Sequence, residues 1–209
     1  MIGMTSVNGF LKWFFDIGNW LAKVMYIHIL WVLFTLMGLV VFGFMPATAA
    51  LFTVIHKGFD GKSDPAIFKT FYETFKTQFL KANALGLLLL GLCAFLYVDM
   101  NISKQVIQSF FVHMFLLIVC FLYFITVLYF FPVFARYKLS YFLYFKQSFF
   151  IAFARPFETI AMIICLVLLF YLFTYLPVLL FFAGSSLIAY PLAWFAYRAC
   201  VQIEERKVN

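Results

Sequence analysis

Long apolar segments alternate with short polar stretches, and this pattern predicts where the chain crosses a membrane. About 20 apolar residues are enough for a helix to span the hydrocarbon core of a bilayer. Five segments meet or approach that length, at residues 24–45, 83–98, 106–131, 157–176 and 178–199. The predicted fold class is all-α, a polytopic membrane protein in which residues 1–209 form one integral membrane domain.

Two shorter segments have the amphipathic pattern of helices that lie in the membrane interface. Residues 8–21 carry one apolar stripe at helical spacing, whereas Lys12, Asp16 and Asn19 lie off that stripe. Residues 66–82 form one aromatic face and one charged face. The aromatic face holds Phe68, Phe71, Tyr72, Phe75 and Phe79, and the charged face holds Lys69, Glu73 and Lys76.

A third aromatic segment, residues 140–154, is long enough either to cross the membrane or to lie flat on it. Lys146 stands in its middle, and a central lysine costs roughly 2.5–3.5 kcal/mol in a membrane-spanning helix. We therefore expect this segment to be a cytoplasmic interfacial helix. If it crossed instead, the C-terminal tail would change sides.

Prolines punctuate three of the predicted spans, at Pro46, Pro132 and Pro191. A proline inside a helix removes a backbone N–H and clashes with the preceding turn, so each is expected to kink its helix. The first kink is expected near residues 43–46. The first two prolines are each followed by a cationic stretch, an aromatic helix and a returning span. This similarity is either a weak two-fold internal repeat or a coincidence in a Phe-rich chain.

The composition excludes several classes of protein. Of the 209 residues, 67% are apolar, 23% are aromatic and only 11% are charged. A soluble domain of this size is about half apolar and about one quarter charged. The chain is therefore not a soluble enzyme, a disordered chain or a disulfide-stapled secreted domain. Its four cysteines also lack the Cys-x-x-Cys spacing of metal or redox sites.

The net charge of +7 is interpreted as a topology signal and not as nucleic-acid binding. With five crossings, the loops on one side hold 12 of the 15 Lys and Arg residues, and the other side holds Lys12, Lys23 and Lys104. The positive-inside rule places the richer side in the cytoplasm. The chain is then predicted to be a multi-pass protein of the bacterial cytoplasmic membrane, with its N-terminus outside and its C-terminus in the cytoplasm.

The polar residues inside the predicted spans are the candidates for chemistry. His28, Asp99 and His113 would all lie toward the outer leaflet and could form a joint proton-relay or metal site. However, no two of them share a helix, so separate packing or interfacial roles are favoured. Arg155 and Glu158, three residues apart, could form a local ion pair. No catalytic motif, cofactor fingerprint or metal motif is present, so we predict no enzyme activity and no cofactor.

The cytoplasmic face is the predicted place for a partner, because aromatic and cationic residues alternate there. Two interfacial helices on that face could rest on anionic lipid and form a ledge for a membrane protein. The candidate docking residues are Lys57, Lys69, Lys76, Phe68, Phe71, Phe75, Phe79, Arg136, Arg155 and Glu158.

Two phrases in the sequence resemble a known family. The first phrase is residues 43–52, followed by Lys57, Gly61, a ladder of phenylalanines (the Phe ladder: Phe68, Phe71 and Phe79) and Asn83. It is similar to the YesL-like family of bacterial integral membrane proteins, and residues 131–136 resemble the second phrase of that family. The family is a domain of unknown function whose members are associated with saccharide uptake systems. The resemblance implies a non-enzymatic accessory protein that contacts the permease of a carbohydrate ABC importer. A small carrier or channel, or a lipid-associated structural protein of the envelope, remains the alternative.

Overall fold

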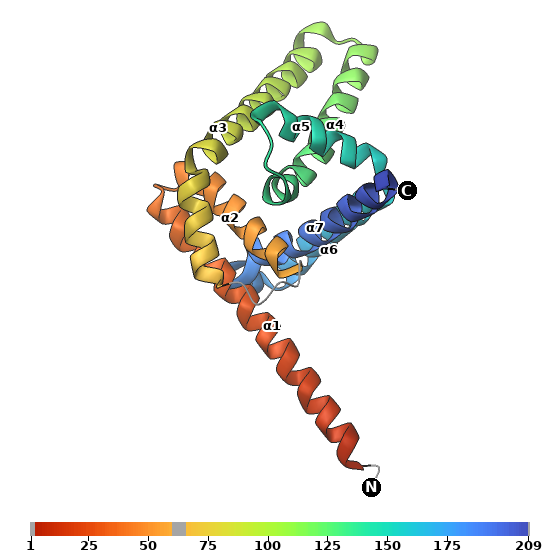
Figure 1. Ribbon diagram of the computed structural model, residues 1–209. Coiled ribbons are helices and arrows are strands. Elements are labelled where there is room, and N and C mark those ends of the chain that lie inside the picture. Colours follow the sequence, from red (N-terminus) through yellow and green to blue (C-terminus); the bar gives the residue numbers. More distant parts are fainter. Residues whose placement is uncertain (1–2, 60–65, 209) are drawn as a thin grey trace.

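The computed structural model describes residues 3–59 and 66–208, and all regular secondary structure over those residues is helical. Seven α-helices and one π-helical turn follow one another in this part of the chain (Figure 1). Their bounds are α1 Gly3–Met37, α2 Val41–Phe59, α3 Ile67–Ile102, η1 Ser103–Ile107, α4 Phe110–Arg136, α5 Tyr141–Ala154, α6 Pro156–Tyr175 and α7 Pro177–Val208. The predicted all-α fold class is confirmed.

Five of the described helices are long and apolar enough to cross a membrane, which confirms the predicted multi-pass class. These segments are Lys12–Met37, Ile67–Gln105, Phe110–Arg136, Pro156–Tyr175 and Pro177–Glu205. The helix boundaries differ from those predicted at two places. Residues 8–21 and 24–37 belong to one helix, α1, and residues 67–82 and 83–98 belong to one helix, α3. The predicted interfacial helices at 8–21 and 66–82 are therefore not separate elements.

The predicted span over 24–45 is wrong as a single helix, because the chain reverses at residues 38–40. Leu39 and Val40 have φ values of 58° and 62°, in the left-handed region that turns the backbone sharply. A Cβ atom at Gly38 would collide with the Cα atom of Gly43, so these two glycines allow α1 and α2 to meet closely. The kink expected near residues 43–46 is therefore replaced by a tight turn five residues earlier.

Pro46 lies inside α2, where its missing N–H leaves one carbonyl without its helical partner. In a regular helix the N–H of residue 46 would donate to the carbonyl of Phe42. Here the side-chain amide of Asn83, from α3, donates to that carbonyl at 2.9 Å. Its second N–H donates to the carbonyl of Phe79 at 3.0 Å. Asn83 thus replaces the hydrogen bond that Pro46 removes and fixes α3 against the start of α2.

The first half of α3 packs against α1 and does not lie free on a membrane surface. Phe71 is fully buried, and its ring centroid lies 5.1 Å from that of Phe34 on α1. Phe75 contacts the same ring at 5.0 Å. Further along α3, a Cβ atom at Gly86 would collide with the side chain of Met45 on α2. The Phe ladder is therefore largely a helix-packing device.

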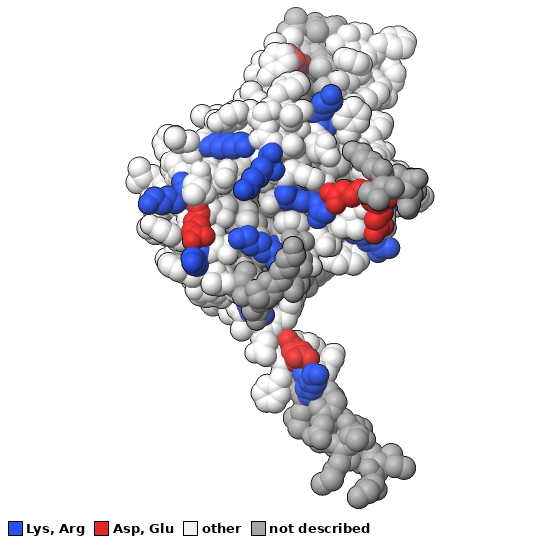
Figure 2. All heavy atoms as spheres, viewed as in Figure 1, with Lys and Arg blue, Asp and Glu red and all other residues white. Residues whose placement is uncertain are grey.

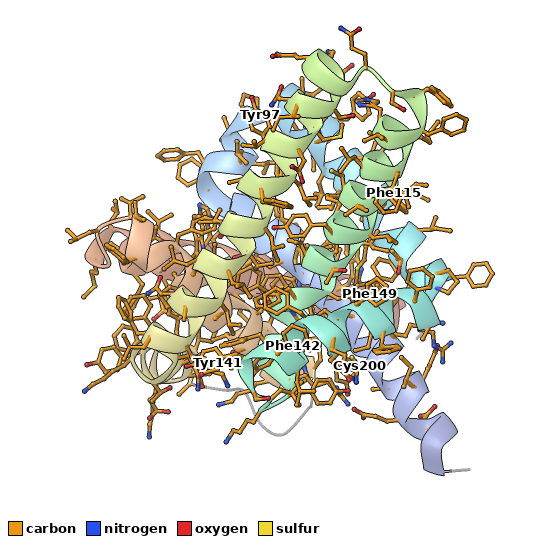
Figure 3. All side chains as sticks on the ribbon, turned by 90° about the horizontal axis from the view of Figure 1, so that it is seen from above. Tyr97, Phe115, Tyr141, Phe142, Phe149 and Cys200 are labelled. Atoms are coloured by element: carbon orange, nitrogen blue, oxygen red, sulfur yellow. The ribbon has the colours of Figure 1, made fainter. Side chains whose placement is uncertain are left out.

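The remaining helices form two antiparallel pairs with a short helix between them. α3 pairs with α4, α6 pairs with α7, and α5 lies across one end of the bundle (Figures 1 and 3). α5 matches the segment 140–154 that the sequence predicts, and Tyr144, Ser148, Ile151 and Ala152 form its buried face. The N-terminal half of α1 projects away from the other helices (Figure 1).

Candidate functional site

A partly buried ion pair joins the end of α4 to the end of α7. The guanidinium of Arg136 donates to both carboxylate oxygens of Glu204, from Nε at 3.2 Å and from Nη2 at 2.6 Å. The phenol of Tyr137 donates to the same carboxylate at 2.6 Å. Burial and this hydrogen bond raise the pKa of Tyr137, so the phenol stays protonated as a donor. A bidentate pair of this kind fixes the orientation of two helices.

Lys81 connects α3 to the segment that leads into α5. Its ammonium group donates to the carbonyl of Leu139 at 2.7 Å and to the hydroxyl of Tyr144 at 3.2 Å. The Tyr144 hydroxyl accepts from the backbone N–H of Leu139 and donates to the carbonyl of Tyr137. The ammonium also lies 4.7 Å from the centre of the Tyr144 ring, a favourable cation–π position. These contacts hold α5 across the end of the bundle.

His28 connects α1 to α7 deep in the apolar part of the protein. Its Nε2 lies 2.8 Å from the carbonyl oxygen of Phe181, which can only accept, so Nε2 carries the proton. Its Nδ1 then accepts from the Ser185 hydroxyl at 2.7 Å and from the Ser185 backbone N–H at 3.3 Å. The carbonyl of residue 181 and the backbone N–H of residue 185 face each other in one turn of α7, and the two ring nitrogens of His28 form hydrogen bonds with both groups.

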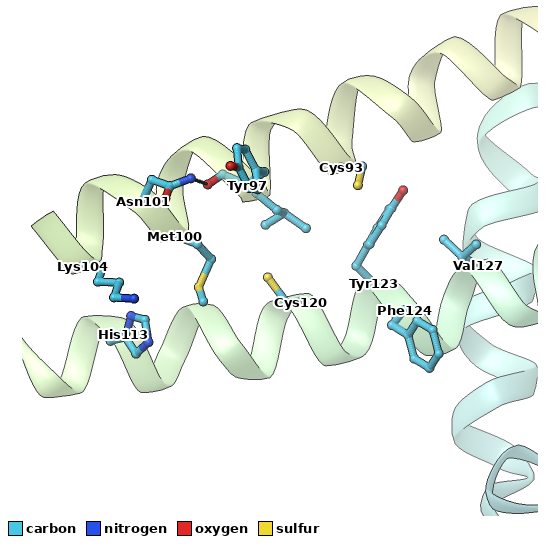
Figure 4. Close-up of a pocket in the computed structure, with 11 residues that line it drawn as sticks. Cys93, Tyr97, Met100, Asn101, Lys104, His113, Cys120, Tyr123, Phe124 and Val127 are labelled. Atoms are coloured by element: carbon cyan, nitrogen blue, oxygen red, sulfur yellow. Dashed lines mark hydrogen bonds between the residues drawn. The ribbon is translucent and has the colours of Figure 1, made fainter. Parts of the chain in front are cut away.

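Two cavities share Val127 on α4 as a lining residue. The first, of about 720 Å³, lies between α3 and α4 (Figure 4). The second, of about 530 Å³, lies between α4, α7 and the α1–α2 pair, and His28, Trp31, Thr48 and Ser185 are its polar lining residues. The indole N–H of Trp31 donates to Thr48, whose hydroxyl donates to the carbonyl of Phe44. The polar side chains of the second cavity therefore already have partners within the protein.

The three residues of the predicted polar set lie apart. His28 contacts α7, whereas His113 lines the cavity between α3 and α4. Asp99 lies on α3 and lines neither cavity. Among the described residues, no group of three His, Cys, Asp or Glu side chains could hold a metal ion. The structure thus brings no joint site together from these residues.

Several predicted docking residues are accessible and others are not. Lys57, Lys69 and Lys76 are exposed, and Figure 2 shows Lys and Arg side chains spread over one face of the molecule. Lys69 lies 4.0 Å from Glu73, a weak surface pair. Phe68 is exposed, Phe75 and Phe79 are half-buried, and the fully buried Phe71 is out of reach of any partner.

Arg155 and Glu158 flank the junction between α5 and α6. Arg155 is half-buried at the position just before α6, and Glu158 lies in the first turn of that helix. The structure contains no ion pair between these two described side chains, so the predicted local pairing is wrong. Glu158 instead stands where a negative charge complements the positive end of the α6 dipole.

The other two prolines lie inside continuous helices, like Pro46. Pro132 is buried in α4, and Pro191 lies within α7. Pro132 lines a narrow gap together with Arg136 and Cys200, beside the Arg136–Glu204 pair. The chain reversal occurs at none of the three prolines.

Sequence reasoning missed the partners that matter most for the packing. Nothing in the sequence pattern distinguishes Lys81 from the other loop cations, or Glu204 from the rest of the charged C-terminal segment. Asn83 belonged to the family phrase without a physical role. A signal was available for Asn83: a polar side chain near the start of an apolar segment, opposite a proline, can satisfy the carbonyl that the proline frees.

The fold and its internal polar contacts define an α-helical membrane protein of the multi-pass class. The family described as "Protein of unknown function, DUF624" matches residues 24–100. The chain is 40% identical to uncharacterized protein YesL of Bacillus subtilis (strain 168) over 197 residues, covering 90% of this chain and 91% of the relative.

Two further Bacillus subtilis (strain 168) proteins are similar over nearly their whole length. Uncharacterized protein YteU is 33% identical, covering 90% of this chain and 85% of the relative, and uncharacterized protein YesV is 36% identical, covering 88% and 89%. No solved structure gives a significant match. The chain therefore belongs to the YesL-like family, as the two sequence phrases indicated.

Proposed function

We propose that this protein is a non-enzymatic accessory membrane protein that binds a second membrane protein through the outer face of α5. The observation that carries the proposal is one strip of exposed side chains on that helix, which we call the α5 strip. It consists of Phe142, Lys146, Phe149, Phe150 and Phe153. These positions recur at helical spacing on the face opposite the buried Tyr144, Ser148 and Ile151.

The chemistry of the α5 strip favours a protein partner at the membrane surface. Lys146 lies in the middle of the strip, 5.8 Å from the centre of the Phe150 ring, and a lysine is costly in the lipid core. The aromatic side chains therefore lie at the interface, where large rings and cations are typical of binding surfaces. Phe142 and Phe149 are both exposed, and Figure 3 labels them along α5. Lys81 and Tyr144 hold this helix in place before any partner binds.

The family resemblance supplies the kind of partner, namely the permease of a carbohydrate ABC uptake system. Such a permease has interfacial segments on its cytoplasmic face, where the α5 strip would meet it.

We further infer that both ends of the chain lie on the cytoplasmic side, in place of the N-outside expectation. Trp20 and Lys23 on α1 line one small cavity together with Gly58 and Phe59 at the end of α2. No membrane crossing can therefore separate Lys23 from Gly58, because α1 and α2 form a hairpin. Among the described Lys and Arg residues, Lys104 alone is then on the opposite side of the membrane. This distribution agrees with the positive-inside rule better than the division of 12 cations against three that the sequence predicts.

Site-specific photo-crosslinking in intact cells tests the docking surface. A photoreactive amino acid at Phe153 should form one crosslinked product with a saccharide permease subunit. The matched control is Phe111, which is also exposed but lies near the start of α4, at the other end of the bundle. Crosslinks to the permease from Phe111 and none from Phe153 would refute the assignment of the α5 strip.

A carrier function is the second candidate, and two cavities that share Val127 as a lining residue support it. Phe52 lines both the second cavity and the gap beside Arg136 and Cys200. The walls are aromatic and aliphatic at most positions, which suits apolar chains better than hydrated sugars. Uptake of a labelled saccharide into proteoliposomes containing only this protein would favour the carrier over the accessory role.

A further inference from the structure

The cavity between α3 and α4 has its polar groups at one end. Lys104 and Asn101 come from the last turns of the α3–η1 segment, and His113 comes from the first turn of α4 (Figure 4). In the same view Lys104 and His113 point toward each other across the mouth of the cavity. The remainder of the wall is lined by apolar, aromatic and sulfur-containing side chains, including Met100, Cys120 and Phe124.

Two polar atoms at the mouth are left without a hydrogen-bond partner from the described residues, one on His113 and one on Asn101. The Nδ1 atom of His113 is buried and has no hydrogen-bond partner. The amide nitrogen of Asn101 donates to the Tyr97 carbonyl within its own helix, which leaves the amide oxygen at the mouth. Deeper in the cavity, the Tyr123 hydroxyl already donates to the carbonyl of Leu89. A buried nitrogen without a partner is costly unless a ligand satisfies it.

The shape of the cavity suits a long apolar chain. From His113 to Val127 the wall follows 14 residues of α4, or about 21 Å of helix. One leaflet of the hydrocarbon core is about 15 Å thick, so the cavity is long enough to run through one leaflet. Its inner end is lined by Val127, which also lines the second cavity. Tyr97 and Phe124 line it and are also exposed, which means that the cavity opens sideways toward the membrane.

We propose that the α3–α4 cavity binds one phospholipid with a negatively charged headgroup, from the leaflet opposite α5. The phosphate accepts from the ammonium of Lys104 and from the imidazole of His113, and one acyl chain lies along the α4 wall toward Val127. Lys104 is the cation that stands at this mouth, so a headgroup with its own positive charge binds less well. This site is separate from the α5 strip and does not depend on the proposed partner.

Native mass spectrometry of the full chain in detergent tests the site with two probes, phosphatidylglycerol and phosphatidylcholine with identical acyl chains. The wild type should retain one phosphatidylglycerol and prefer it over phosphatidylcholine by about tenfold, the scale of one charge-assisted contact. The double variant Lys104→Gln/His113→Phe should lose that preference. Lys138→Gln, an exposed lysine beside α5, is the matched control and should keep it.

Two further arms separate a lipid site from simpler alternatives. Cys120→Phe places a ring in the cavity and should abolish retention of both lipids while the unfolding temperature stays unchanged. Inorganic phosphate at millimolar concentration should not displace the bound lipid, because the acyl chain of the lipid makes most of its contact with the cavity. Equal retention of the two lipids by the wild type, an unchanged preference in the double variant, lipid retained by a folded Cys120→Phe chain, or displacement by phosphate would each overturn the proposal.

Discussion

Asn83 should contribute more to the free energy of unfolding when residue 46 is proline than when it is alanine. Pro46 cannot donate to the carbonyl of Phe42, and the Asn83 amide donates to it instead at 2.9 Å. Asn83→Leu keeps the approximate volume but leaves that carbonyl without a donor. A carbonyl that loses its donor costs about 1–3 kcal/mol when it is buried and less when it is exposed, as this one is, and polar contacts between membrane helices reach about 1.7 kcal/mol. We therefore expect a loss of about 1–2 kcal/mol in the free energy of unfolding.

The second half of the cycle restores the missing donor. In Pro46→Ala the backbone N–H of residue 46 can donate to Phe42 as in any helix, although the buried ring of Pro46 is lost. In that background Asn83→Leu should cost less than about 0.5 kcal/mol, which leaves a coupling of about 0.5–2 kcal/mol. Reversible unfolding of the four proteins in mixed micelles, followed by tryptophan fluorescence, measures each difference.

Asn101→Leu is the matched control for this cycle. Its side-chain amide donates only to the Tyr97 carbonyl four residues earlier in the same helix, with no proline nearby. We expect a small loss and no coupling to Pro46. The reasoning fails if Asn83→Leu costs the same in both backgrounds, or if Asn101→Leu shows an equal coupling to Pro46→Ala.

Three further predictions follow from the fold. Arg136→Leu leaves the Glu204 carboxylate with Tyr137 as its one hydrogen-bond donor and should lower the free energy of unfolding by about 1–3 kcal/mol. Arg198 is exposed, and Arg198→Leu should change that free energy by less than about 0.5 kcal/mol in the same denaturation assay. Gly43→Ala places a methyl group against the Thr35 carbonyl and should lower the free energy of unfolding by about 1–3 kcal/mol. Gly91→Ala has open space around the added atom and should be neutral or stabilising. A similar loss in both variants would argue against the tight α1–α2 turn. Reporter fusions that are active only in the cytoplasm should be active at both ends of the chain, and an active reporter at the C-terminus alone would restore the N-outside topology.

The sequence predicted those parts of the fold that depend on composition and periodicity. Five apolar helices are a consequence of segment length, and α5 was correctly separated because Lys146 makes a crossing costly. The reversal at residues 38–40 was missed, since Leu39 and Val40 are apolar and continue the hydrophobic pattern without a break. A left-handed conformation at a β-branched residue is rare, so no local rule points to it.

The internal polar contacts were the least predictable feature. Arg136 and Glu204 are 68 residues apart in the sequence, and only the return of α7 to the end of α4 brings them together. His28 was singled out as an intramembrane polar residue, but the sequence could not identify Ser185 as its partner across 157 positions. Periodicity describes each helix separately, whereas these contacts depend on how the helices pack.

Affinity purification in native lipid tests the proposed function most directly. A tagged wild-type chain, extracted with its surrounding lipid and analysed by quantitative mass spectrometry, should carry a saccharide permease subunit at about one copy per chain. Phe142→Ser/Phe153→Ser, on the α5 strip, should lose that subunit while the protein remains monodisperse, and Phe110→Ser/Phe111→Ser should retain it. A wild type that purifies without a permease, or that retains it equally in both double variants, would contradict the accessory role.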